Sequence, residues 1–290
     1  MNTQKITVLG AMGSRIATNL LKAGYTVTVW NRSHKAVEAL AATGAIVAPT
    51  PKIAVRDAKI VISMVTDSEA SRSIWLDTET GALWGLHQDA IAIESSTLTV
   101  SYIRELAAKI SSRGVAFLDA PVVGSRPQAD SGNLIYLVGG KAETLKQAEN
   151  ILLSAGGGKI HHAGDIGQGM VMKLAVNALF GIQVVALAEI MGMLTKSGLE
   201  LEKVIQCLGE LPVISPAAKN AVNLMLMDNH TPMFPINLVE KDFRYVLETA
   251  ENLDAQTPVS KVIRDIYASA IGLGYGGDNI TGVARIFMGK

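Results

Sequence analysis

The sequence predicts an α/β domain with a doubly wound parallel sheet, followed by an all-α domain, with a long helix joining the two. Short apolar runs of strand length alternate with helix-like segments through the first half of the chain, which is typical of a parallel sheet covered by helices. This β pattern stops near Gly169, and residues 170–196 form an apolar stretch with almost no helix breaker. The rest of the chain has helical patterns separated by prolines such as Pro216 and Pro258.

The expected elements of the first half follow from apolar periodicity. Strands are predicted over residues 5–10, 25–30, 45–47, 60–65, 90–94, 116–119 and 134–138. Helices are predicted over residues 13–23, 35–43, 100–112 and 142–153. We expect the boundary near Gly164, so that residues 1–164 form the first domain and residues 165–290 form the second.

Composition excludes several classes of partner. The chain has 290 residues, of which 49% are hydrophobic, with 26 basic and 26 acidic residues and no long run of either sign. A balanced charge argues against nucleic acid or an anionic membrane surface as the main partner. The single cysteine, Cys207, excludes an intramolecular disulfide and favours a cytoplasmic protein.

No targeting or membrane segment is expected. The first residues lack a cationic stretch followed by an apolar one, so the sequence does not predict a signal peptide. The apolar stretch over residues 179–194 is interrupted by Gln183 and Glu189, which favours a buried helix over a membrane span.

A glycine turn between the first strand and the first helix is the expected cofactor site. Backbone N–H groups at such a turn, together with the helix start, bind the diphosphate of a dinucleotide. The candidates here are Gly10, Ala11, Met12 and Gly13. If Gly10 ends the strand, the turn is two residues shorter than a full G-x-G-x-x-G motif, and G-x-x-G is weak evidence by itself.

The end of the second strand indicates which dinucleotide is bound. An acidic residue there would bind the ribose hydroxyls of NAD. This chain has Asn31, Arg32 and Ser33 instead, with Lys35 close by. A guanidinium and a small hydroxyl suit a 2′-phosphate, so NADP(H) is the predicted cofactor. The alternative is a solvated arginine at a strand end.

Lys173 and Asn177 are the polar residues at the start of the long apolar helix. They are four residues apart, which places both on one helix face. A desolvated lysine is readily tuned for proton transfer, which favours a catalytic role for Lys173. The alternative is a lysine that extends to solvent at the helix start.

Taken together, these residues and others make the chain resemble the β-hydroxyacid dehydrogenase family. The resemblance runs from Lys5 to near the C-terminus and rests on four stretches whose order and spacing are jointly specific. These are Ala11-Met12-Gly13 with Asn19-Leu20, then Asp119-Ala120-Pro121-Val122, then Gly167-Gln168-Gly169 with Lys173 and Asn177, and finally Lys241-Asp242. It implies an N-terminal Rossmann domain, a long connecting helix, and a helical C-terminal domain like that of 6-phosphogluconate dehydrogenase, through which dimers or tetramers form.

The resemblance also implies residue roles. Lys173 would be the catalytic acid and base, and Asn177 would help to hold the substrate. Thr97 would lie near the nicotinamide side of the cofactor, and Met64 and Val65 would flank its adenosine and ribose. Lys241 would reach the cofactor from the second domain, although a surface lysine paired with Glu240 or Asp242 is the alternative. Glu94 stands where the family more often has aspartate.

The predicted substrate loop departs further from the family pattern. The family usually has Ser-Gly-Gly after Ala-Pro-Val, whereas this chain has Val123, Gly124 and Ser125, followed by Arg126. We expect the amides of Gly124 and Ser125 to bind a substrate carboxylate, with Ser125 or Arg126 replacing the lost hydroxyl. The alternative is a weakened preference for carboxylates.

These predictions favour an NADPH-linked reductase of small semialdehydes or oxo acids, which acts on a 3-hydroxyacid or 2-hydroxyacid in reverse. Glyoxylate and succinic, tartronate and methylmalonate semialdehydes are candidate substrates. An imine reductase on the same architecture is one alternative, although such enzymes generally have Asp or Tyr at the position of Lys173. A non-catalytic scaffold with an impaired cofactor turn is the other. The five histidines form no zinc pattern, so no metal is expected.

Overall fold

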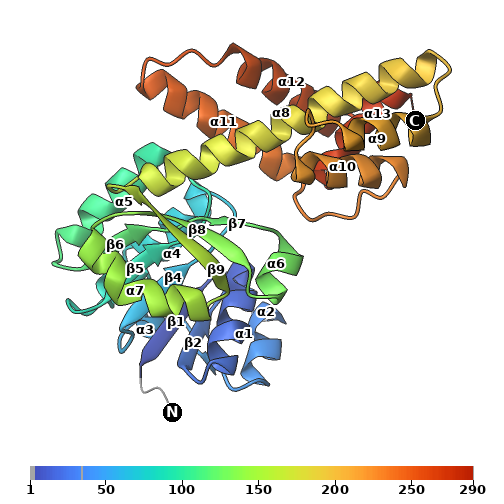
Figure 1. The fold of residues 1–290 in the computed structure, drawn as a ribbon. Helices are drawn as coiled ribbons and strands as arrows, with labels where there is room; N and C mark the ends of the chain where they lie inside the picture. Colours follow the sequence, from blue (N-terminus) through green and yellow to red (C-terminus); the bar gives the residue numbers. More distant parts are fainter. Residues whose placement is uncertain (1–3, 34, 290) are drawn as a thin grey trace. The chain divides into compact units, whose positions relative to one another are not determined.

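The computed structural model describes residues 4–33 and 35–289. Residues 1–3, which belong to the segment for which no signal peptide is predicted, lie outside the described residues. The described chain divides into two compact units, Met1–Lys173 and Leu174–Lys290 (Figure 1). This division falls inside the long helix, whereas the predicted boundary at residue 164 remains a prediction.

The first unit is built on a mixed sheet of nine strands among the described residues. The strand order is β3-β2-β1-β4-β5-β6-β8-β7, and β9 pairs with β8. The strands are β1 (Lys5–Leu9), β2 (Thr26–Trp30), β3 (Ile46–Val47), β4 (Ile60–Ser63), β5 (Ile91–Glu94), β6 (Ala116–Asp119), β7 (Val122–Val123), β8 (Leu134–Gly139) and β9 (Gly157–Gly164).

The predicted parallel sheet is confirmed for the first six strands, and the structure departs from it at β8. Strands β1 to β6 pair in parallel, while β8 runs antiparallel to both β6 and β7. A parallel return needs a crossover of a dozen or more residues. The connection between β7 and β8 contains only the five-residue helix α6 (Arg126–Asp130). It is too short for a parallel return, so β8 runs antiparallel to β7.

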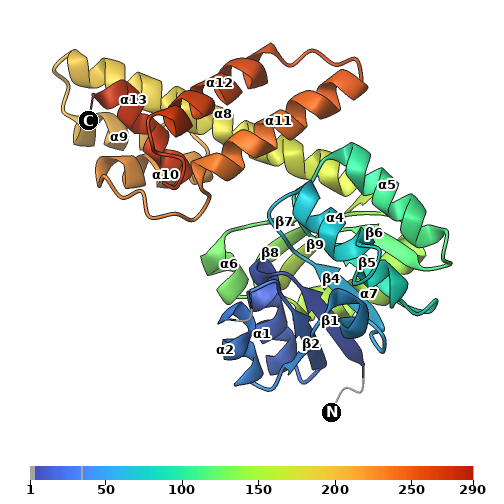
Figure 2. The same ribbon diagram turned by 180° about the vertical axis from the view of Figure 1, so that it is seen from behind.

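Helices cover both faces of the sheet. They are α1 (Ser14–Lys22), α2 (Lys35–Ala41), α3 (Pro51–Ala54), α4 (Ser68–Leu76), α5 (Val100–Ser111), α6, and α7 (Ala142–Ser154), with 3-10 turns η1 (Ala11–Gly13) and η2 (Ala82–Trp84). Helix α1 packs beside α2 and α7, whereas α4 packs beside α5 on the opposite face (Figures 1 and 2). Apolar residues of α1 such as Ile16 and Leu20 are fully buried against strand residues such as Val8.

The carboxyl ends of five parallel strands lie level with one another. Leu9 pairs in register with Trp30 and Ser63, Ser63 with Glu94, and Glu94 with Asp119. Ligands of open parallel sheets bind outside this edge. The candidate residues of the first unit lie in the loops that leave it.

The second unit is helical. Its elements are the greater part of α8 (Gln168–Lys196), α9 (Leu201–Glu210), α10 (Pro216–Leu226), α11 (Ile236–Asn252), α12 (Pro258–Gly272), η3 (Ile280–Val283) and α13 (Ala284–Met288). Phe243 of α11 stacks on Tyr267 of α12 with ring centroids 5.8 Å apart, and the Tyr267 hydroxyl donates to the Gly181 carbonyl at 3.1 Å. A side chain at Gly181 would lie 2.6 Å from the Phe243 ring, so this glycine allows α8 to pack closely.

Helix α8 is the element whose composition most resembles a membrane helix. Among the described residues it alone is long and apolar enough to cross a bilayer. A single helix of this kind is weak evidence, because helices in the cores of soluble proteins have the same composition. Of the methionines in the helical unit, Met191 and Met225 are buried, whereas Met193 and Met227 are exposed.

Candidate active site

The turn between β1 and α1 requires glycine. Gly10 has φ +96°, and a Cβ there would lie 2.5 Å from the carbonyl oxygen of Met64. Its N–H donates to the Trp30 carbonyl at 2.9 Å, which closes the turn over the neighbouring strand. A Cβ on Gly13 would lie 2.5 Å from Val8. Both glycines therefore allow close approach of the backbone.

The same turn leaves a helix start open. The residues at the N-cap positions are Gly10 before η1 and Gly13 before α1, and glycine has no side chain that could cap the first N–H groups. The first N–H groups of a helix have no intrahelical acceptor. Those of Ala11 and Met12 belong to exposed residues at the carboxyl edge of the sheet. This arrangement suits a phosphate group even though the turn is short.

The three residues after β2 form a compact, exposed turn. Asn31 donates its amide N–H to the Ser33 carbonyl at 3.0 Å, and Arg32 and Ser33 are exposed. Lys35 begins α2 beside them. A guanidinium and a hydroxyl are therefore available to a ligand at this strand end.

The loops after β4 and β5 are tied together by a buried serine. The backbone N–H of Val65 donates to the Ser96 hydroxyl oxygen at 2.8 Å, and the Ser96 hydroxyl donates to Glu94 at 2.5 Å. The Met64 N–H continues the strand pairing by donating to the Leu9 carbonyl at 2.9 Å. The two loops predicted to flank the cofactor are thus held by one side chain, directly before Thr97.

Glu94 is the centre of that network, with one carboxyl oxygen bonded to Ser96. Its second carboxyl oxygen accepts from the Ser71 hydroxyl at 2.6 Å and from Trp75 Nε1 at 2.8 Å, both on α4. The residue is fully buried. Burial raises the pKa of Glu94, while the hydrogen bonds from Ser71, Ser96 and Trp75 oppose that rise.

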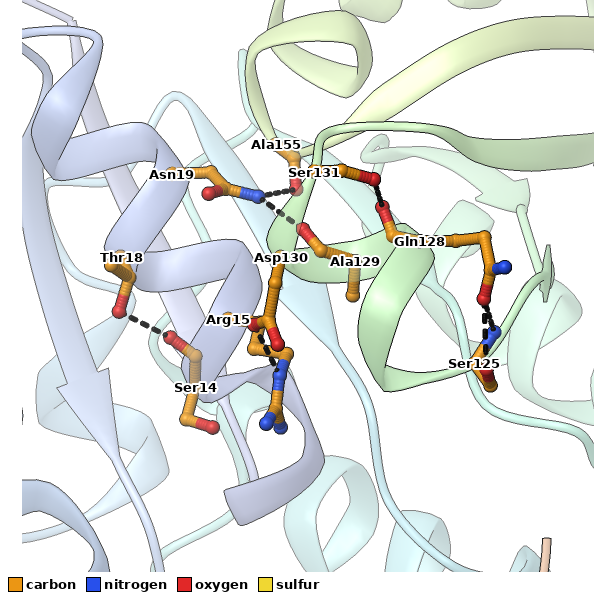
Figure 3. Close-up of polar contacts among 10 residues, drawn as sticks. All are labelled: Ser14, Arg15, Thr18, Asn19, Ser125, Gln128, Ala129, Asp130, Ser131 and Ala155. Atoms are coloured by element: carbon orange, nitrogen blue, oxygen red, sulfur yellow. Dashed lines mark hydrogen bonds and ion pairs between the residues drawn. The ribbon is translucent and has the colours of Figure 1, made fainter. Parts of the chain in front are cut away.

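The predicted substrate loop is shaped by a glycine and a local cap. Gly124 has φ +128°, and a Cβ there would lie 2.9 Å from Leu134. The N–H and hydroxyl of Ser125 both donate to Gln128 Oε1, at 2.9 and 2.8 Å (Figure 3). A substrate carboxylate would therefore compete with Gln128 for these donors.

Helix α6, which follows that loop, is bonded to the helix that follows the cofactor turn. Arg15 Nε donates to Asp130 Oδ1 at 2.6 Å (Figure 3). The Asn19 amide donates to the carbonyl oxygens of Ala129 at 3.1 Å and Ala155 at 3.4 Å. The predicted substrate loop and the predicted cofactor helix are thus brought together within the first unit.

The start of α8 is capped by the last residue of a strand of the sheet. Asp119, the last residue of β6, is fully buried, and its carboxyl oxygens accept from the N–H groups of Gly167 at 2.7 Å and Met170 at 2.8 Å. A Cβ on Gly169 would lie 2.4 Å from the Leu137 carbonyl oxygen. Burial raises the pKa of Asp119, and the two N–H donors oppose that rise. Gly169 therefore allows α8 to pack closely on the sheet, whereas Gly167 allows the positive φ of +92° before the helix.

Lys173 lies one turn further along α8 and is half-buried, and Asn177 follows on the same face. Within the second unit, Asn177 Nδ2 donates to Asp242 Oδ2 at 2.6 Å. Lys241 Nζ lies 3.1 Å from Asp242 Oδ1 and 4.8 Å from the centre of the Tyr245 ring. Because Asp242 Oδ1 has no hydrogen-bond donor among the described residues, this contact is an ion pair rather than a hydrogen bond.

The alternative for Lys241 is half right, because the lysine pairs with Asp242 as that alternative expected, but both residues are buried rather than at the surface. The sequence did not indicate a role for Glu94 or Asp242. In the structure, Glu94 accepts a hydrogen bond from Ser96 and Asp242 accepts one from Asn177. The signal available for Glu94 was an acidic residue directly after a buried apolar run. No group of three or more His, Cys, Asp or Glu side chains in the described ranges suits a metal ion.

Comparison with known proteins adds to this geometry. The family model for the NAD binding domain of 6-phosphogluconate dehydrogenase matches residues 6–164, and the model for the NAD-binding domain of NADP-dependent 3-hydroxyisobutyrate dehydrogenase matches residues 167–287. The chain is 32% identical to an NAD-dependent L-serine dehydrogenase of Pseudomonas aeruginosa, over 96% of this chain and 95% of that protein.

Two further relatives cover nearly the whole chain. A 3-hydroxyisobutyrate dehydrogenase of Pseudomonas aeruginosa is 30% identical, with 97% of each protein covered. Among solved structures, a Mycobacterium tuberculosis 3-hydroxyisobutyrate dehydrogenase with L-serine is 28% identical, with a TM-score of 0.86, 98% of this chain covered and 99% of that one.

Proposed function

The chain belongs to the β-hydroxyacid dehydrogenase family, and from that premise we propose that it is an NADP(H)-dependent enzyme that interconverts a small 3-hydroxyacid, or a 2-hydroxyacid, and its semialdehyde or oxo acid. Membership makes it an oxidoreductase of the hydroxyacid dehydrogenase type that uses a nicotinamide cofactor. The preference for NADP(H), the substrate class and the residue roles are the proposal.

One observation carries the mechanism. Lys173 lies one turn after the start of α8, and that start is hydrogen-bonded to Asp119 at the carboxyl edge of the sheet. The chain runs from Asp119 through Ala120 and Pro121 into β7, and the predicted substrate loop follows at the end of β7. A lysine held at this point can serve a substrate bound by the loop.

The residues of the β1–α1 turn fit a dinucleotide. Gly10 has no room for a side chain, and the helix start beyond it is open to a diphosphate. Met64, Val65 and Thr97 would line the remainder of the cofactor site, together with Lys241. When bound, the nicotinamide supplies or accepts the hydride.

A side chain of the protein has to donate or remove the proton. Hydride addition to a carbonyl leaves an alkoxide oxygen, and the Lys173 ammonium would donate a proton to it. In the oxidative direction the neutral amine would remove the hydroxyl proton. Asn177, fixed by Asp242, would hold the substrate from the same helix face.

The proposed substrate class rests on a chemical feature shared by the compounds in the names of two relatives. L-Serine and 3-hydroxyisobutyrate are both acids with a hydroxyl on the β-carbon. The amide of Gly124, and that of Ser125 once the carboxylate displaces Gln128, would bind the carboxylate, with Val123 providing an apolar wall. Homo-oligomers through the helical unit and a cytoplasmic location remain predictions.

The NADP(H) proposal rests on Arg32 and Ser33, both exposed at the end of β2. Arg32→Ala should weaken NADPH binding by about tenfold or more and leave NADH binding nearly unchanged, because a hydrogen bond to a charged group contributes about 1.5–3 kcal/mol. Lys22→Ala, at the far end of α1, is the matched control for loss of one exposed cation. Equal loss of both cofactors in Arg32→Ala would contradict the preference.

The function is tested by initial rates with a panel of 3-hydroxyacids, semialdehydes, glyoxylate and cyclic imines, using NADPH and NADH in parallel. We expect turnover of a small hydroxyacid and its carbonyl partner. Turnover of cyclic imines alone would identify an imine reductase. Absence of NADPH binding at millimolar concentration in a fluorescence titration would identify a scaffold.

A further inference from the structure

The side chain of Met170 makes a contact that the mechanism above does not use. Its thioether sulfur accepts a hydrogen bond from the backbone N–H of Leu98 at 3.2 Å. Met170 and Leu98 are both fully buried. Leu98 directly follows Thr97, the residue expected beside the nicotinamide. A buried backbone N–H that loses its acceptor is costly, so this contact fixes the loop after β5 to α8.

The backbone of the same residue is held from another direction. The N–H of Met170 donates to Asp119 at the end of β6, and the N–H of Gly167 donates to the other oxygen of that carboxyl group. The first turn of α8 is therefore bonded to two loops of the carboxyl edge, one through the backbone of Met170 and one through its side chain.

We propose that Met170 and Asp119 are positioning residues that set the rotation and height of the first turn of α8, and so the location of the Lys173 ammonium group. This inference rests on the proposed function of Lys173. Each helical residue adds about 100° of rotation and about 1.5 Å of rise. Lys173 is three residues beyond Met170, so a small rotation at Met170 moves the long lysine side chain across the site.

The choice of variants follows from the chemistry of the sulfur. Leucine has nearly the volume of methionine but no acceptor, so Met170→Leu keeps the packing and removes the bond to Leu98. Glutamine has a similar length and an amide oxygen, so Met170→Gln keeps an acceptor but buries an amide N–H₂ group among apolar side chains. The two variants therefore separate positioning from packing.

We expect their stabilities and activities to rank in opposite orders. Met170→Leu should lower the melting temperature slightly, because the Leu98 N–H loses its acceptor, and should keep the cofactor Kd but lose about tenfold or more in kcat, since a misplacement of 1 Å can cost about 10²-fold. Met170→Gln, which buries an amide N–H₂ group, should melt earlier still yet keep more of kcat than Met170→Leu. Asp119→Asn, which replaces one acceptor oxygen by a donor, should lower kcat with little change in cofactor Kd.

Two controls make the test decisive. Met191→Leu changes another fully buried methionine of α8 in the core of the helical unit, and should leave kcat unchanged. Amide hydrogen exchange at Leu98 should speed up in Met170→Leu and stay slow in Met170→Gln, which is a readout independent of turnover.

The outcomes also separate this inference from the proposed function. If Met170→Leu keeps the wild-type kcat while Lys173→Met is inactive, the positioning role is wrong and the catalytic role of Lys173 stands. If Met170→Gln loses more kcat than Met170→Leu, packing rather than the hydrogen bond is what matters. If Lys173→Met keeps the wild-type rate, the proposed mechanism fails first.

Discussion

Two glycine turns open two helices in the first unit, and they look alike in the sequence. Gly10 and Gly13 precede α1, and Gly167 and Gly169 begin α8. Gly10 and Gly167 have positive φ, and Gly10 and Gly169 leave no room for a Cβ beside a backbone carbonyl. Local geometry alone therefore does not say which helix start would accept a ligand.

The difference lies in what the helix starts already bind. The N–H groups at the start of α8 donate to the buried carboxyl group of Asp119, whereas in the described chain no N-cap side chain bonds to the start of α1. The N–H groups of a helix start need acceptors, and the carboxyl oxygens of Asp119 supply them at α8. Of these two helix starts, the start of α1 is the one left for a phosphate, and Gly169 of α8 serves packing.

The largest expected effect tests the packing role of the α8 turn. A Cβ at Gly169 would lie within 3 Å of the Leu137 carbonyl oxygen, the Gly139 nitrogen and the Asp119 carbonyl oxygen, none of which is a flexible side chain. Gly169→Ala should lower the free energy of unfolding by about 3 kcal/mol or more, measured by urea denaturation. Gly272→Ala, where no atom lies within 4 Å, is the control and should change it by less than about 1 kcal/mol.

At the α1 turn we expect a smaller loss of stability than at the α8 turn, but a larger loss of cofactor binding. Gly10→Ala would strain a backbone with φ +96° and push against the Met64 carbonyl. We expect a loss of about 1–3 kcal/mol in stability together with loss of NADPH binding in a fluorescence titration. Normal NADPH affinity in a folded Gly10→Ala protein would mean that the cofactor does not use this turn.

The pH dependence of stability tests the internal carboxyl group at α8. Because burial raises the pKa of Asp119, the folded state holds its proton more tightly than the unfolded chain does. The stabilisation from this group is present below the unfolded pKa of about 3.9 and is lost as pH rises through the folded pKa. The difference in unfolding free energy between wild type and Asp119→Asn should fall as pH rises above about 4, by at most about 1.4 kcal/mol per pH unit. A difference that grows with pH would show that the N–H donors outweigh burial.

The smallest expected effect concerns the ion pair beside the open helix start. The side chains of Arg15 and Asp130 are 40% and 60% exposed, so Arg15→Ala should change the unfolding free energy by less than about 1 kcal/mol. A larger change would mean that the contact between α1 and α6 depends on the pair. The change in unfolding free energy for Arg15→Ala is compared with that for Asn19→Ala on the same helix, which removes the hydrogen bonds to Ala129 and Ala155.

The fold was accessible from local patterns, because strands β1 to β6 and their helices each carry their own apolar periodicity. The antiparallel β8 was not, since its direction depends on the length of the connection after β7. Motif positions such as Lys173 could be named from the sequence. The partners of Glu94 on α4 and the pairing of Asn177 with Asp242, 65 residues apart, could not, because they arise only when distant elements pack.

The central claim, that Lys173 supplies the proton, is tested most directly by chemical rescue. Lys173→Ala should bind NADPH with wild-type affinity, lose about 10²-fold or more in kcat, and recover part of it when methylammonium is added. Lys241→Ala, assayed in the same way, should show no such recovery. A wild-type rate in Lys173→Ala, or equal responses of the two variants to the amine, would contradict the account.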